Sequence, residues 1–355
     1  MKKLLLLSLF LCSLEIAQAQ PGISTAIPSE KPSKYQNDQI KRKYGMFIHF
    51  GINTFHDVEW SDGAFPVETY APTEIDARQW VKTAKDAGMK YIILVAKHHE
   101  GFCLWDSKYT DYDVASSGNK TNVIEAVARE CKKQGMKLGL YYSLWDRKVN
   151  ADVDNVESDR EYNTYMLKQL DELMDITEKY TKIVEFWFDG SWVKPGYRWP
   201  VEGIYRTIKS REPQCQIGIN WTIGEDADPH NPNAPEKSYK IIPEEQKEGD
   251  PIRYFPSDFR LGDPLLPANP DPKVFTHNGK RYYMPFESTV CLSKRWFYHT
   301  TDKEYKSIDE LVKLYQRATA QDNILILNLP PNREGKMRQK DVDLLIELRK
   351  HIRKL

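Results

Sequence analysis

Residues 182–190 read KIVEFWFDG, an apolar, β-favouring run that ends in a carboxylate and a glycine. A strand this apolar is typical of a parallel sheet that is buried on both faces. Asp189 then has two explanations. It begins a loop or caps a helix, or the strand presents a catalytic carboxylate at its open end. The segments on either side of this strand are needed to choose between them.

Strand-like and helix-like segments alternate along most of the chain. Alternation of this kind indicates parallel strands joined by right-handed crossovers. No GxGxxG motif follows the first strand, so a dinucleotide-binding fold has no support. Six or seven such units in 355 residues predict an α/β fold, an irregular (β/α)8-like TIM barrel. The predicted strands are 44–52, 90–97, 137–143, 182–189, 216–220, 282–287 and 323–330, and the predicted helices are 74–88, 121–135, 158–180, 201–211, 308–321 and 338–353.

The interval 222–281 interrupts this alternation. It contains ten prolines and no convincing periodicity, so we expect a long loop there. Loops of this length inside a compact domain are usually functional or mobile.

The first nineteen residues have the pattern of a secretory signal peptide. Lys2 and Lys3 precede the apolar run LLLLSLFLCSL, and Ala-Gln-Ala just before Gln20 provides a small-x-small cleavage site. A short N-terminal membrane anchor is the alternative, but the run is too short for a comfortable span. We expect export to the periplasm or the extracellular space, with a flexible lead (20–34) and one catalytic barrel domain (35–355).

Charge and cysteine usage narrow the possible partners. The chain has 51 basic and 51 acidic residues, a balance that does not suggest nucleic acid or an anionic membrane as a partner. Once the signal is removed, the remaining cysteines are Cys103, Cys131, Cys215 and Cys291. No CxxC pair occurs among them, which excludes a zinc ribbon. An oxidising compartment permits disulfides, but we expect buried free thiols.

Residues suited to chemistry gather at the ends of the predicted strands. In a barrel, the carboxyl ends of all strands share one rim, and active sites are built there. One histidine would more often be a core residue, but a coincidence at five strand ends indicates a site. The five ends carry His49; His98 and His99; Tyr142 and Trp145; Trp187 and Asp189; and Glu287.

Two carboxylates among histidines and indoles suit a carbohydrate substrate. Sugar hydroxyls take directional hydrogen bonds, sugar C–H faces pack on aromatic rings, and two carboxylates facing one glycosidic bond can hydrolyse it. A metal-dependent hydrolase is one alternative. His98 and His99 should diverge on a strand, however, and no HxH or HExxH motif occurs, so we expect no metal and no cofactor. A non-catalytic sugar-binding barrel is another alternative, and it would not need both carboxylates.

Seven motifs occur in consistent order over residues 35–350. They are KYGMFIHFGINTF (43–55), Glu59-Trp60, AKHHEGFCLWDSKYTDYDV (96–114), YYSLWDR (141–147), EFWFDG (185–190), FESTVCLSKRWFYH (286–299) and LILNLPPNREG (325–335). Together they resemble the α-L-fucosidases of glycoside hydrolase family 29, and most closely the branch that acts on α-1,3/1,4-linked fucose. The resemblance implies a retaining, exo-acting enzyme on an α/β barrel, with a fucosylated oligosaccharide or glycoconjugate as substrate.

The resemblance also implies roles for single residues. Asp189 matches the nucleophile, and Glu287 matches the acid/base of the α-1,3/1,4 branch. The two carboxyl groups are then expected about 5–5.5 Å apart. The rival acids are Glu244, Glu245, Glu248 and Asp258. The residues expected to bind substrate are His49, Glu59, Trp60, His98, His99, Tyr142, Trp145 and Trp187.

The chain departs from the family pattern at several places. The family usually reads HHDG at 98–101. The α-1,3/1,4 branch usually reads SIRPGWFYH where this chain has CLSKRWFYH (291–299), and GRNANLLLN where this chain has the segment that begins at Ala320. The β-sandwich domain that commonly follows the barrel is not expected, because the chain stops at Leu355. These departures leave the leaving sugar and the linkage open. An α-L-galactosidase is the alternative, because an apolar wall discriminates weakly against an added hydroxyl.

Overall fold

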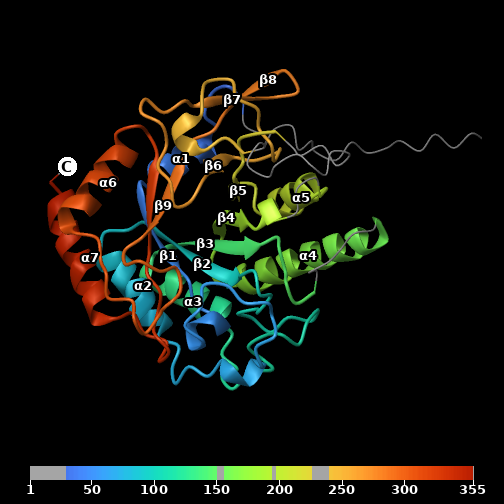
Figure 1. Ribbon diagram of the computed structural model, residues 1–355, viewed down its shortest axis with the longest axis vertical. Helices are drawn as coiled ribbons and strands as arrows, with labels where there is room; N and C mark the ends of the chain where they lie inside the picture. Colours follow the sequence, from blue (N-terminus) through green and yellow to red (C-terminus); the bar gives the residue numbers. More distant parts are fainter. Residues whose placement is uncertain (1–28, 150–155, 194–196, 226–239, 355) are drawn as a thin grey trace, which may run out of the picture.

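The computed structural model describes residues 29–149, 156–193, 197–225 and 240–354 (Figure 1). The predicted signal peptide and residues 20–28 of the predicted lead lie outside these ranges. Within the described ranges, no helix is both long enough and apolar enough to cross a membrane.

Eight parallel strands of the described chain form one sheet, in the order β6-β5-β4-β3-β2-β1-β10-β9. The two outer strands approach each other: Arg260 and Phe286 form a parallel bridge, and the Arg260 N–H donates to the Pro285 carbonyl at 2.8 Å. The sheet is therefore a nearly closed barrel, and the predicted (β/α)8-like fold is confirmed. The strands are β1 (Tyr44–Ile48), β2 (Tyr91–Lys97), β3 (Lys137–Ser143), β4 (Ile183–Asp189), β5 (Gln216–Asn220), β6 (Phe259–Leu261), β9 (Glu287–Cys291) and β10 (Ile324–Asn328).

Helices surround this barrel (Figure 1). Their ends follow local signals. Asp76 and Asn122 cap the starts of α2 and α3, and Gly135, in a left-handed conformation with φ of 68°, ends α3. The helices are α1 (Lys34–Ile40), α2 (Ala77–Asp86), α3 (Val123–Gln134), α4 (Val156–Thr177), α5 (Val201–Arg211), α6 (Ile308–Thr319) and α7 (Gln339–Ile352). Short 3-10 turns are η2 (Ile52–Phe55), η3 (Val67–Thr69), η4 (Ser191–Val193) and η6 (Pro243–Glu245).

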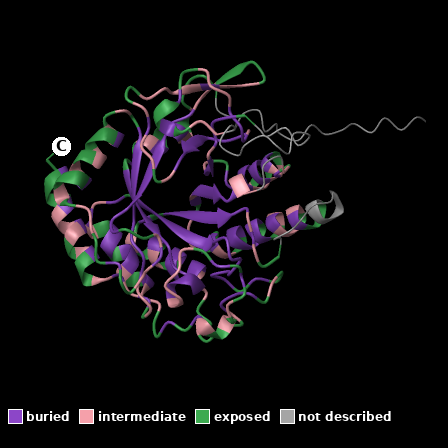
Figure 2. Ribbon diagram, viewed as in Figure 1, coloured by how far each residue is buried: buried purple, intermediate pink, exposed green. Residues whose placement is uncertain are grey.

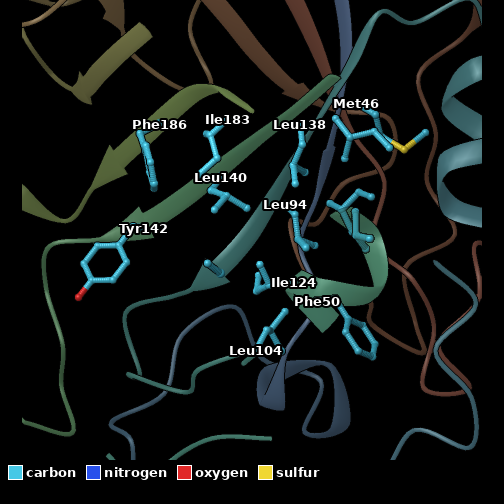
Figure 3. Close-up of a cluster of buried hydrophobic side chains, with 14 of the residues drawn as sticks. Met46, Phe50, Leu94, Leu104, Ile124, Leu138, Leu140, Tyr142, Ile183 and Phe186 are labelled. Carbon is cyan, nitrogen blue, oxygen red and sulfur yellow. The ribbon is translucent and has the colours of Figure 1, made fainter. Parts of the chain in front are cut away.

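The strands are buried on both faces (Figure 2). Because strand side chains alternate, each strand contributes to two separate cores. The outer core, between sheet and helices, contains Leu138, Leu140 and Tyr142 of β3 (Figure 3). The inner core fills the barrel and contains Tyr141 of the same strand. The four cysteines after the predicted signal are buried and free, as expected.

The interval 222–281 is less irregular than expected where the structure describes it. It contains β6 and an antiparallel hairpin of β7 (Val274–His277) and β8 (Lys280–Tyr283). The predicted strand 282–287 is wrong. These residues include the end of β8, the connection after it and only the first residue of β9. Pro285 lies between them, and proline cannot donate to a strand ladder. Glu287 is therefore the first residue of its strand, not the last.

Candidate active site

A cavity of about 240 Å³ opens at the C-terminal ends of the barrel strands. Sites for drug-sized ligands span roughly 300–1,000 Å³, so this cavity suits a single small ring. Predicted site residues on its wall are His49, Trp60, His98, His99 and Asp189. Residues on its wall that the sequence analysis did not select are Trp192, Asn220, Trp221, Lys240, Asp263 and Trp296.

Asp189 is the last residue of β4 and is only 8% exposed. Its Oδ2 accepts from the Tyr141 hydroxyl at 2.9 Å, and its Oδ1 accepts from Asn220 Nδ2 at 3.0 Å and from Trp192 Nε1 at 3.2 Å. His99 Nε2 lies 3.6 Å from Oδ2. Donors from three segments thus hold an acceptor-only carboxylate. Asp189 therefore neither caps a helix nor merely opens a loop; it is held in place at the cavity wall.

Asp263 is the second carboxyl group of the cavity. It lies two residues after β6 and is half-buried. Asn220 Nδ2 donates to Oδ1 of Asp263 as well as to Asp189. Two oxygens bonded to one nitrogen lie at most about 6 Å apart, twice a hydrogen-bond length of about 3 Å. Loss of solvent, and then the negative charge of Asp189, raise the pKa of Asp263 to about 7.

The structure does not bring Glu287 to this cavity. Glu287 opens β9 at the N-terminal end of the barrel, where it is 1% exposed and accepts from the Tyr91 hydroxyl at 2.7 Å. It also hydrogen-bonds Glu185. Glu185 precedes Asp189 by four residues, about 13 Å at 3.3 Å per residue. The expectation that Glu287 ends a strand at the rim, 5–5.5 Å from Asp189, is therefore wrong.

The buried surroundings of Glu287 raise its pKa. Burial, followed by the charge of Glu185, raises the pKa of Glu287 well above its usual value. Arg42 Nη1 lies 3.1 Å from Glu185 Oε2, so the guanidinium faces the partner that carries the charge. A raised pKa was expected for Glu287, but its cause lies at the N-terminal end of the barrel, and Glu287 is not among the residues of the cavity wall.

The three predicted histidines do lie together on the cavity wall. His49 Nδ1 is 2.7 Å from Asn328 Oδ1, and His99 Nδ1 is 2.7 Å from Ser143 Oγ. Burial, and then the charge of His98, hold the pKa values of His49 and His99 well below their usual range. Both rings are therefore neutral near pH 7, and each offers one donor and one acceptor.

His98 and His99 do not diverge as expected. They follow Lys97, the last residue of β2, so strand alternation no longer separates them, and their ring centroids lie 4.2 Å apart. Among the described residues, no three His, Cys, Asp or Glu side chains are grouped as metal ligands.

The predicted aromatic residues divide between the wall and its support. Trp60 lies on the wall and is 48% exposed. Trp145 stands behind it, with its ring 5.4 Å from that of His99. Trp187 lies in the inner core, where it stacks on Tyr141 with ring centroids 5.4 Å apart. Trp187 therefore supports Tyr141, a donor to Asp189, and is not itself part of the wall.

Two further predicted residues do not reach the cavity wall. Tyr142 points into the outer core, where its hydroxyl donates to Gln169 at 2.7 Å and accepts from Lys97 at 3.0 Å. The neighbouring Tyr141 faces the inner core instead, and its hydroxyl donates to Asp189. Glu59 accepts from the backbone N–H groups of Trp296 and Phe297, each at 3.2 Å, and so holds the Trp296 segment in place.

The rival acids lie elsewhere. Asp258 is buried just before β6, 2.7 Å from Lys209 Nζ, and accepts from the Tyr205 hydroxyl at 2.8 Å. Glu244, Glu245 and Glu248 are exposed. Asp263 ends the segment FRLGD much as Asp189 ends FWFD, but its strand is only three residues long and contains Arg260, so the apolar signal is weak.

Comparison with known proteins identifies the family of the chain. The family model for α-L-fucosidase matches residues 11–354. Alpha-L-fucosidase 1 of Arabidopsis thaliana is 31% identical over 332 residues, which cover 89% of this chain and 59% of that protein. This chain thus spans about three fifths of the length of that relative.

Two solved structures share the fold. Alpha-L-fucosidase isoenzyme 1 from Paenibacillus thiaminolyticus is 26% identical with a TM-score of 0.68, covering 90% of this chain and 76% of that one. A GH29 fucosidase of Ruminococcus gnavus, solved in complex with fucose, is 25% identical with a TM-score of 0.70, covering 92% and 69%. With the family model matching nearly its whole length, this chain belongs to the α-L-fucosidase family.

Proposed function

We propose that the protein is a retaining, exo-acting α-L-fucosidase that removes terminal α-linked L-fucose from glycans, with Asp189 as nucleophile and Asp263 as acid/base. One observation carries the assignment: two carboxyl groups share Asn220 Nδ2 on the wall of one cavity. An upper limit of about 6 Å between their bonded oxygens supports retention, because inverting enzymes need about 6.5–9.5 Å between the carboxyl groups to admit a water.

The two carboxyl groups are prepared for different tasks. Asp189 accepts three hydrogen bonds, which aim it into the cavity as an attacking oxygen. Asp263 has a pKa of about 7, so a large fraction holds a proton at neutral pH. A carboxyl group with a raised pKa beside a nucleophile is typical of the general acid in such a site. Glu287 is not part of this pair.

The reaction then takes two steps. Asp189 attacks the anomeric carbon while Asp263 gives its proton to the glycosidic oxygen, so the leaving sugar departs and a fucosyl-enzyme ester forms. Asp263, now ionised, takes a proton from water, and that water attacks the anomeric carbon and releases Asp189. Two inversions give net retention of configuration.

The remaining wall residues suit a fucose ring. The neutral imidazoles of His49 and His99 can exchange directional hydrogen bonds with ring hydroxyls, and the exposed indole of Trp60 can cover an apolar face. The fucose complex of the Ruminococcus gnavus relative supports this choice of sugar. The resemblance to the α-1,3/1,4 branch supports those linkages, and the N-terminal pattern supports export by a signal peptide.

The test is Asp189→Gly on an aryl α-L-fucoside. The rate should fall by several orders of magnitude, because no covalent intermediate can form. Added azide should enter the space left by the carboxylate, restore turnover and give a fucosyl azide of inverted configuration. Loss of activity without azide rescue would leave Asp189 without its assigned role, and near-wild-type activity would refute the proposal.

A further inference from the structure

Among the described residues on the wall of the cavity beside Asp189, Lys240 is the one lysine or arginine. Its Nζ lies 4.3 Å from the ring centroid of Trp221 and 5.9 Å from that of Trp192. No carboxylate of the described residues lies within ion-pair distance of it. Lys240 is close enough to Asp263 for its charge to lower the pKa of that group, but the two form no ion pair. An ammonium group thus rests on two indoles with no anion of the described chain to neutralise it.

The backbone that carries Lys240 is fixed. Lys240 forms an antiparallel bridge with Gly224, and the Ile241 N–H donates to the Ile223 carbonyl at 3.1 Å. On the other side, the Gly224 N–H donates to the Pro251 carbonyl at 2.9 Å. Ile223 itself is buried in a small apolar cluster with Ile252, Phe275 and Met284. The ammonium is therefore presented from a packed segment of the rim.

Trp221 is also held in a defined position. Its φ of 61° is a left-handed conformation, which is uncommon for a bulky residue and marks a local constraint. The Trp221 N–H donates to Asn220 Oδ1 at 3.0 Å. The same Asn220 side chain donates to Asp189 and Asp263. One residue thus ties the position of the indole to that of the two carboxyl groups.

With Asp263 as the acid/base, Lys240 and Trp221 lie on the leaving-group side of the cavity, and Trp192 lies between them and Asp189. An acid/base must face the glycosidic oxygen, so side chains beside Asp263 face the sugar that departs. A sugar ring packs its C–H face on an indole, as on Trp221 or Trp192, and leaves its substituents at the edge of the ring. An unpaired ammonium at that edge favours a negative substituent, because charge-assisted hydrogen bonds are about twice as strong as neutral ones.

We propose that Trp192, Trp221 and Lys240 form a leaving-group subsite that prefers an aglycone sugar bearing an anionic group, a carboxylate or a sulfate ester. This inference rests on the proposed fucosidase activity and adds the substrate class. Fucose occupies the inner cavity, and the acidic leaving sugar stacks on the indoles with its anion on Lys240.

The experiment compares matched pairs of α-1,3-linked fucosyl disaccharides. In one pair the leaving sugar is N-acetylglucosamine or its 6-sulfate; in the other it is glucose or glucuronic acid. The measured quantity is the ratio of kcat/KM for the anionic over the neutral member, in wild type, Lys240→Met and Lys240→Arg. Methionine keeps an apolar stem on Trp221, and arginine keeps the charge.

In wild type the ratio should exceed about 5 for at least one pair, as one charge-assisted hydrogen bond allows. Which pair responds distinguishes sulfate from carboxylate. Lys240→Met should bring that ratio to about 1, Lys240→Arg should keep most of it, and 0.5 M salt should reduce it in wild type. Because both members of a pair need the same acid, an effect of Lys240 on Asp263 cancels in the ratio.

Two results would overturn the inference while leaving the proposed function intact. One is a ratio near 1 in wild type for both pairs. The other is a ratio that is the same in Lys240→Met as in wild type, with cooperative thermal unfolding of the variant showing that it is folded. Absence of hydrolysis of the disaccharides and of aryl α-L-fucosides alike by wild type would instead refute the proposed function, and this inference with it.

Discussion

The barrel contains two carboxyl pairs of similar construction, one at each end. At the C-terminal rim, Asp189 accepts from Tyr141, and Asn220 links it to Asp263. At the N-terminal end, Glu287 accepts from Tyr91 and hydrogen-bonds Glu185, to which Gln39 donates at 3.2 Å. Loss of solvent and the partner carboxyl group raise the pKa of Asp263 at the rim and of Glu287 at the other end, where burial also raises the pKa of Glu185. The residue types and pKa values alone would not tell the pairs apart.

What separates the two pairs is access. The rim pair borders a cavity of about 240 Å³, whereas Glu185 and Glu287 are 0% and 1% exposed. Arg42 Nη1 lies 3.1 Å from Glu185 Oε2 and offsets the negative charge of the Glu185–Glu287 pair. Trp187 of the inner core lies between Glu185 and Asp189 along β4. A perturbed pKa indicates that a group is buried or lies beside a charge. The group is a candidate for catalysis only where it also borders a cavity with room for a substrate.

The largest expected difference between the pairs is in catalysis. Asp263→Asn should lower kcat/KM on a fucosylated glycan by at least about 100-fold, because natural leaving sugars need a proton. Activated aryl fucosides, whose leaving groups need little protonation, should lose far less. Glu287→Gln is the matched control at the other end of the barrel, and its kcat/KM should stay within about twofold of wild type. The opposite pattern would return the acid role to Glu287.

The next comparison is between the two faces of β3. Tyr141→Phe removes a hydrogen bond to the Asp189 carboxylate, worth about 1.5–3 kcal/mol, so kcat/KM should fall roughly 10- to 100-fold. Tyr142→Phe removes a hydroxyl from the outer core and should lower the melting temperature with little change in kcat/KM. Equal kinetic losses in both variants would contradict the assignment of Tyr141 to the site.

A third comparison uses pH. The proposed acid form of Asp263 is lost as pH rises through its pKa of about 7, so kcat/KM on a glycan should fall up to tenfold per pH unit above that value. Lys240 lowers this pKa, so Lys240→Met should move the alkaline limb to higher pH. If the alkaline fall in kcat/KM occurs at the same pH in Asp263→Asn and Lys240→Met as in wild type, it reports the titration of another group.

The smallest expected effect is on the stability of the folded protein and comes from the Glu185–Glu287 pair at the N-terminal end of the barrel. The folded pKa of Glu287 lies well above its unfolded value of about 4.3, so its contribution to stability is complete below that value and is lost as pH rises through the folded pKa. Glu287→Gln carries no such proton. Between pH 5 and pH 8 the melting temperature of wild type should therefore fall more than that of the variant. Parallel curves would mean that Glu287 is ionised in the folded protein.

Local patterns in the chain were enough for the architecture and for part of the site. Alternating apolar strands and capped helices specify a parallel barrel, and the carboxyl ends of such strands must meet at one rim. His49, His98, His99 and Asp189 could be placed there because each lies at the end of a long apolar run or within three residues of it. The reason is physical: strand formation and capping depend on neighbours within a few residues.

Contacts between distant segments determine which tyrosine and which second carboxyl group lie beside Asp189. In a strand buried on both faces both neighbours are apolar, so the pattern could not decide whether Tyr141 or Tyr142 faces inward. Glu287 was misplaced by one strand boundary, which moved it to the opposite end of the barrel. Asp263 follows a strand of three residues in a proline-rich interval, and it reaches Asp189 only through Asn220 of a third segment. No local preference encodes that meeting; the packing of the closed barrel does.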